Sequence, residues 1–155
     1  MAIRFVALPT EAVRAVRDGA PDANGMPVER HVAQAGGLPC RHCLGAIDKG
    51  EELLVLAWRP FPAAQPYAEV GPIFLHGRDC ARGGGSAQIP AFLSSPRYIV
   101  RGYGADDRIV YGTGAVIETD RIPGYAEELL ARPGIAYAHV RSATNNCFHC
   151  RIERA

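Results

Sequence analysis

Residues 38–58 read LPCRHCLGAIDKGEELLVLAW, and residues 71–80 read GPIFLHGRDC. Each stretch joins a pair of metal-binding residue types to an apolar run, at 52–58 in the first stretch and at 72–75 in the second. Short apolar runs that are bounded by glycine and proline are typical of buried strands. The two stretches therefore predict two buried strands, each next to one half of a metal site.

The metal-binding residues come as Cys40 with Cys43 and His76 with Cys80. A Cys-x-x-Cys turn places two thiolates on one side of a zinc ion, which takes four nitrogen or sulfur donors in a tetrahedron. The second pair shares a face if a helical turn begins at His76, because residues i and i+4 of a helix are neighbours. We therefore expect one zinc ion with a closed set of four protein ligands, which is typical of a structural site.

A cysteine knuckle, a leucine-rich strand and a strand that ends at His76 have the outline of a treble-clef zinc site. This part of the chain resembles fingers of the poly(ADP-ribose) polymerase type and LIM-like fingers, through Cys40-x-x-Cys43, the segment 47–51 (IDKGE), and His76 with Cys80. The closing pair is His-x-x-x-Cys, whereas such fingers have His-x-x-Cys. The resemblance therefore implies a metal site more than it implies binding to nucleic acid.

The whole chain predicts an α+β fold, a single domain with a largely antiparallel sheet and few short helices. Helices are expected at 9–18 and 122–132, and a hairpin is expected to turn at 104–107. The segment 83–86 (GGGS) is expected to be a flexible seam. Strands are expected at 3–8, 26–34, 52–58, 72–75, 98–103, 108–111, 115–118, 135–141 and 147–154.

Length and charge narrow the class of protein. A chain of 155 residues fits one domain that buries a sizeable core without needing a metal to fold. The formal net charge of +1 gives no strong nucleic-acid or membrane signal. The odd number of cysteines, five, and the lack of a signal-peptide pattern favour reduced thiols in the cytoplasm. Of the 17 Lys and Arg residues only Lys49 is lysine, a bias typical of GC-rich bacterial genomes.

The first cysteine pair also fits a thiol redox protein that uses Cys40 and Cys43. The intervening His42 is the kind of neighbour that lowers a thiol pKa in disulfide oxidoreductases. That chemistry requires a helix beginning at Cys40, and Gly45 and Gly50 interrupt the sequence that follows. The metal interpretation is therefore preferred.

The last predicted hairpin supports an enzyme as the alternative. Cys147 is a candidate nucleophile, with His139 and Arg141 as further catalytic candidates on the preceding strand. A metal with an open position, and His76 or His139 as acid or base, is the other enzymatic arrangement. Whether Cys147 and Cys150 join the metal site stays open at this point.

The pairing of that hairpin decides whether its cysteine and histidine meet. With a two-residue loop at 145–146, Arg141 stands opposite Cys150 and His139 stands opposite Ile152. His139 and Cys147 then lie on different faces of the sheet, and a longer loop of odd length reverses this.

A binding protein would use basic residues of the second half. Arg101, His139 and Arg141 are candidates for binding a small anionic ligand, because guanidinium groups pair with carboxylate and phosphate. If the zinc ion is structural, we expect the function to lie near these residues.

The chain resembles, almost from end to end, a bacterial family called domain of unknown function 1203. The residues that carry the resemblance are 39–44 (PCRHCL), 50–51 (GE), 59–61 (RPF), 66–69 (PYAE), 71–76 (GPIFLH), Cys80, 101–103 (RGY), 139–141 (HVR) and 147–148 (CF). The resemblance implies one compact unit and a pattern that groups His76 and Cys80 with Cys40 and Cys43. It implies no activity, because none is assigned to the family.

Overall fold

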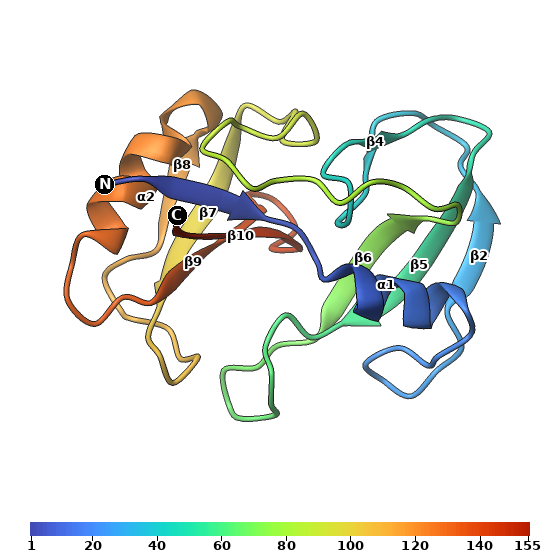
Figure 1. The fold of residues 1–155 in the computed structure, drawn as a ribbon, viewed down its shortest axis with the longest axis horizontal. Helices are drawn as coiled ribbons and strands as arrows, with labels where there is room; N and C mark the ends of the chain where they lie inside the picture. The colour runs from blue at the N-terminus through green and yellow to red at the C-terminus, as the bar shows by residue number, and fades with distance from the viewer.

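Two antiparallel sheets stand at opposite ends of the long axis in the computed structural model, which describes residues 1–155 (Figure 1). The larger sheet has five strands in the order β1-β10-β9-β7-β8. Its neighbouring strands all run antiparallel. The strands are β1 (Ile3–Val6), β10 (Phe148–Arg154), β9 (Tyr137–Ser142), β7 (Arg97–Tyr103) and β8 (Ala115–Glu118).

The smaller sheet contains β2 (Glu29–Val32), β5 (Glu52–Trp58) and β6 (Gly71–His76), in that order. Helix α1 (Thr10–Arg17) packs its buried Val13 and Val16 into the core of this half. A third, two-stranded sheet joins β3 (Leu38–Pro39) to β4 (Ala46–Ile47). The expected α+β fold with mostly antiparallel sheets and few short helices is confirmed.

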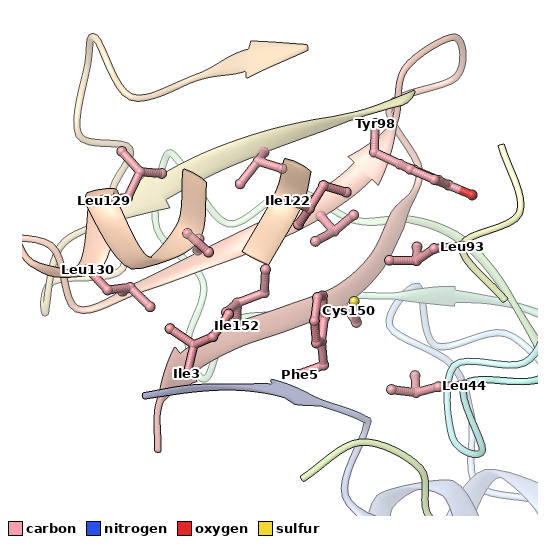
Figure 2. Close-up of a cluster of buried hydrophobic side chains, with 14 of the residues drawn as sticks. Ile3, Phe5, Leu44, Leu93, Tyr98, Ile122, Leu129, Leu130, Cys150 and Ile152 are labelled. Carbon is pink, nitrogen blue, oxygen red and sulfur yellow. The ribbon is translucent and has the colours of Figure 1, made fainter. Parts of the chain in front are cut away.

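Helix α2 (Ile122–Leu130), which follows the 3-10 turn η1 (Thr119–Arg121), covers the five-stranded sheet. Its buried residues, Ile122, Ala126, Leu129 and Leu130, recur at the spacing of one helical face. Figure 2 shows Ile122, Leu129 and Leu130 over the sheet, on the side of Ile3 of β1 and Ile152 of β10. Each large side chain buried here contributes about 1.5–3 kcal/mol. Neither helix of the chain is long and apolar enough to cross a bilayer.

The two halves are tied together by segments that cross between them. Leu44 follows the first cysteine pair and packs into the core of the five-stranded sheet, beside Phe5 and Leu93 (Figure 2). The segment 83–86, predicted as a flexible seam, runs beside β1. The amide of Phe5 donates to the carbonyl of Ser86 (2.9 Å), and the amide of Gly85 donates to the carbonyl of Phe5 (2.8 Å). These bonds restrict the backbone of the segment.

One predicted strand does not form. Within 108–111, only Ile109 bridges back to Tyr103. The chain turns at Gly112, where φ is 86°, and Thr113 accepts a hydrogen bond from the backbone of β7 (3.0 Å). Strand β8 therefore occupies this edge of β7 and pairs with it over four residues.

The predicted pairing of the last two strands is also wrong. Arg141 lies opposite Phe148 and His139 lies opposite Arg151. The turn is longer than two residues, since the amide of Ser142 donates to the carbonyl of Cys147 (2.9 Å). The register then shifts once more at a bulge between Phe148 and Cys150.

Candidate metal centre

Four donor atoms from Cys40, Cys43, His76 and Cys80 lie within 4.8 Å of one another. The Sγ atoms of Cys40 and Cys80 are 4.0 Å apart, and the Sγ of Cys43 is 3.5 Å from Nδ1 of His76. Ideal zinc bond lengths place donors of a tetrahedron about 3.8 Å apart for two sulfurs and about 3.6 Å apart for sulfur and nitrogen. The cluster therefore has dimensions that fit one tetrahedral ion.

The first pair is positioned by the hairpin of β3 and β4. The amide of Cys40 donates to the carbonyl of Gly45 (2.9 Å), and the amide of Leu44 donates to the carbonyl of Cys40 (3.0 Å). Leu44 closes the turn with φ at 57°, a left-handed conformation that is uncommon for a residue other than glycine. The turn directs both cysteine sulfurs to one side, and no helix begins at Cys40.

The second pair is positioned differently from the prediction. His76 is the last residue of β6, and the chain continues as a bend rather than as a helical turn. The amide of Gly77 donates to the carbonyl of Glu52 (2.9 Å), so strand pairing extends one residue past His76. The bend after Gly77 then brings Cys80 back to the cluster.

The ring of His76 has one nitrogen in the cluster and the other outside it. Its Nδ1 faces Cys43, while its Nε2 lies 3.5 Å from Oε1 of Glu51 and 3.3 Å from a guanidinium nitrogen of Arg78. A metal at Nδ1 fixes the ring proton on Nε2, where it can point to Glu51. Histidine ligands of metals commonly hold a carboxylate in this way.

The thiols of the cluster do not titrate independently. The pKa of Cys40 is lowered to about 4, first by a hydrogen bond from Cys43 and further by backbone amides, although burial opposes this. The same interaction raises the pKa of Cys43, and burial raises the pKa of Cys80. Cys40 is thus the sulfur best prepared to be a thiolate, which is the form that binds metal.

Two further groups contact the sulfur of Cys80. A guanidinium nitrogen of Arg17 and Nδ1 of His42 each lie 3.2 Å from it. The Arg17 side chain is 7% exposed, so its charge is little screened. Three thiolates and one histidine around Zn²⁺ carry a net negative charge, which Arg17 can offset.

The cysteine turn also reaches both halves of the molecule. Nε of Arg41 donates to the carbonyl of Phe148 (2.8 Å), at the start of β10. Nε2 of His42 pairs with the hydroxyl of Thr10 (2.9 Å), at the start of α1. The carbonyl of His42 accepts from Gly83 (2.8 Å). A metal ion that fixes this turn would therefore fix contacts to both sheets.

The redox pair that the sequence suggests lies in the same cluster. The low pKa of Cys40 suits thiol chemistry, but Cys40 is fully buried. The adjacent His76 and Cys80 complete a ligand set that a redox pair does not require.

The catalytic candidates of the last hairpin do not meet. The sulfur of Cys147 has one polar contact, 3.8 Å from the carbonyl of Asn145. His139 is fully buried among aromatic rings and pairs through Nδ1 with Arg141 (3.4 Å). Cys150 lies in the apolar core beneath α2, and neither Cys147 nor Cys150 belongs to the metal cluster.

The predicted anion-binding arginines share one carboxylate. Glu69 lies 3.0 Å from Arg101 and 3.4 Å from Arg141. The guanidinium of Arg141 also donates to the carbonyl of Asn146 (3.2 Å). These two cations are thus already paired, and His139 is the candidate whose ring retains an unused nitrogen.

Sequence reasoning missed Arg17 and Glu51 as neighbours of the cluster, and it interpreted His42 only as a redox neighbour. Arg17 is on α1, and nothing in the local sequence connects it to Cys80. The Gly50-Glu51 dipeptide, by contrast, lies just after the knuckle and was available as a signal.

A comparison with known protein families finds one whose model matches most of the chain. The family model described as "Protein of unknown function (DUF1203)" matches residues 37–154, which include all four residues of the cluster. No curated protein matches the chain, and no solved structure does.

Proposed function

The chain belongs to the DUF1203 family, whose description assigns no activity, and we propose that it is a binding domain held together by one structural zinc ion. Cys40, Cys43, His76 and Cys80 would be the ligands. Four protein donors fill a tetrahedral shell and leave no open position for substrate or water. Chemistry at the ion is therefore not part of the proposal.

The spacing of the donor atoms is the observation that carries this proposal. The two distances of 4.0 and 3.5 Å match the edges of a zinc tetrahedron, and each joins the segment 40–43 to the segment 76–80. All four donor atoms also lie within 4.8 Å of one another, and they are of the types that zinc takes. The contact of Glu51 with the outer nitrogen of His76 supports the same assignment.

A structural role is supported by where the cysteine turn lies. Leu44 enters the core of the larger sheet, and Arg41 holds the start of β10. The ion would therefore stabilise the junction between the sheets, and ligand binding would take place elsewhere. The five free cysteines support a reducing, cytoplasmic setting for the protein.

The test is the metal content of protein purified without added metal. We expect close to one zinc per chain by elemental analysis, and loss of that zinc in Cys40→Ser. Cys147→Ser is the matched control, since it removes a thiol outside the cluster and should leave the zinc in place. Substitution with Co²⁺ should give the absorption of a tetrahedral site with thiolate ligands.

Two outcomes would contradict the proposal. A metal-free protein whose cluster thiols all react in the folded state would remove the zinc site. A zinc site that binds an added anion or exchanges a water ligand, seen as a change in the Co²⁺ spectrum, would show an open position and favour an enzyme.

A further inference from the structure

A cavity of about 460 Å³ lies between the two halves of the molecule, away from the metal cluster. Its wall is built from the link after β1, the end of β5, and strands β9 and β10. Figure 1 shows the link after β1 running from the larger sheet to α1 beside the smaller sheet. The volume falls in the range of sites for small molecules, which often form at such junctions.

Much of the wall is apolar. Trp58, Pro60, Phe61 and Phe148 line it together with the link that leads to α1. Phe61 and Phe148 also pack against the ring of His139, with centroids 5.1 and 4.8 Å away. A ligand with an apolar body would bury that body against these rings.

His139 lines the same cavity and has an unused polar atom. Arg141 lies 3.4 Å from its Nδ1, and a guanidinium can only donate, so Nδ1 accepts and the ring proton is on Nε2. Burial lowers the pKa of His139 well below 6.5, which keeps the ring neutral. Nε2 is buried without a hydrogen-bond partner. The ring is 0% exposed and packed among aromatic rings, so its Nε2 is closed to a ligand in the cavity, which contacts this part of the wall through Phe61 and Phe148.

The charged residues of the wall leave a positive excess. Arg59, Arg82 and Arg151 line the cavity with Glu153 as the one acidic residue. Arg151 is paired with Glu153 (2.6 Å). Arg59 forms no ion pair, and its Nε is buried without a partner. Arg82 donates only to the carbonyl of Ala7 (2.8 Å).

A buried donor without a partner is unusual in a folded protein, because it loses its bond to water and gains nothing in exchange. Here Nε of Arg59 is such a donor on a residue of the cavity wall, and Nε2 of His139 is another, although it is closed to a ligand. Arg59 forms no ion pair, so an acceptor with negative charge that enters the cavity can pair with its guanidinium group. Arg101 and Arg141 differ, since both pair with Glu69, although Nε of Arg141 also lacks a hydrogen-bond partner.

We propose that this cavity binds a small organic anion, with its carboxylate or phosphate group held by the guanidinium groups of Arg59 and Arg82. The apolar body of the ligand lies against Trp58 and Phe61. The proposal rests on the binding role proposed above, and it names the site and the class of ligand.

The test uses the full chain with its metal content measured on the same sample. Phenyl phosphate and phenylacetate are titrated by calorimetry, with inorganic phosphate as the anion that lacks an apolar body. We expect both aromatic anions to bind, and inorganic phosphate to bind at least about tenfold more weakly. Arg59→Gln and Arg82→Gln should each weaken binding about tenfold or more, as expected for loss of a charge-assisted hydrogen bond.

Arg132→Gln is the matched control, because it removes one exposed arginine far from the cavity wall and should leave the affinity unchanged. The wild-type protein gives an independent readout, since binding should shift the NMR signals of the Trp58 indole and of the His139 ring. Absence of binding by all three anions, or equal binding by wild type and both cavity variants, would overturn the proposal. Equal affinity for phosphate and phenyl phosphate would overturn its apolar part.

Zinc content separates this proposal from the previous one. A protein that holds one zinc and binds no anion overturns the cavity site alone. A protein that binds the aromatic anions without zinc supports the cavity site and contradicts the metal proposal.

Discussion

Acid should destabilise this protein through a histidine that takes no part in the metal cluster. His149 lies at the bulge of β10 and is 8% exposed, with its ring 5.5 Å from Phe92 and 5.2 Å from Tyr98, centroid to centroid. Burial lowers its pKa from 6.5 to about 4, and the nearby charge of Arg41 lowers it further.

Between these pKa values the unfolded chain binds a proton that the folded chain does not. The free energy of unfolding should therefore fall as the pH is lowered from 6.5 to about 4, and should be constant with respect to this group above that window. The difference between the pKa values corresponds to roughly 3 kcal/mol, of which about 2 kcal/mol is lost between pH 7 and pH 5.

The assay is urea denaturation at pH 7 and pH 5, followed by the fluorescence of Trp58, the single tryptophan. His149→Phe keeps an aromatic ring in the site and removes the titrating group. Its loss of stability between the two pH values should be about 2 kcal/mol smaller than that of the wild type. His31→Gln, at an exposed position, is the control and should follow the wild type. An equal loss in wild type and His149→Phe would refute the reasoning.

Three further results are expected. Leu44→Ala should lower the free energy of unfolding by about 2–5 kcal/mol, since it empties a buried site, whereas the exposed Val116→Ala should change it by less than about 0.5 kcal/mol in the same urea assay. Gly83→Ala should lower the melting temperature and speed zinc release to a chromogenic chelator, because its Cβ would collide with the carbonyl of Cys43. Gly124→Ala in α2, where a Cβ meets open space, should instead raise the free energy of unfolding by about 0.5–1 kcal/mol. Equal rates of zinc release from both variants would count against the role given to the cysteine turn at 40–44. Removal of zinc by a strong chelator should lower the melting temperature and make the cluster thiols reactive, and an unchanged melting curve would argue that the ion is not structural.

Much of the fold could be predicted because its signals are local. The helix at 122–132 and the strands at 52–58 and 72–75 have apolar spacings that a single segment contains. The bulge at His149 and the loss of the 108–111 strand could not be predicted, because they depend on which neighbour takes the edge of a strand.

The candidate metal site could likewise be predicted only in part. The pairs Cys40 with Cys43 and His76 with Cys80 are visible in the sequence because metal ligands need particular residue types at short spacing. The route by which Cys80 returns to the cluster is not visible, and the predicted helical turn at His76 is replaced by a bend. Arg17 reaches Cys80 only because α1 packs beside the smaller sheet.

By itself, the sequence determined the α+β class, the four residues of the candidate metal cluster and a set of basic residues in the second half. Only the tertiary structure decided which of those basic residues form ion pairs: Glu69 pairs with Arg101 and Arg141, while Arg59 and His139 pair with no carboxylate. The physical reason is that a residue type fixes which hydrogen bonds a side chain can make. Whether each bond is made depends on groups that folding brings from distant parts of the chain.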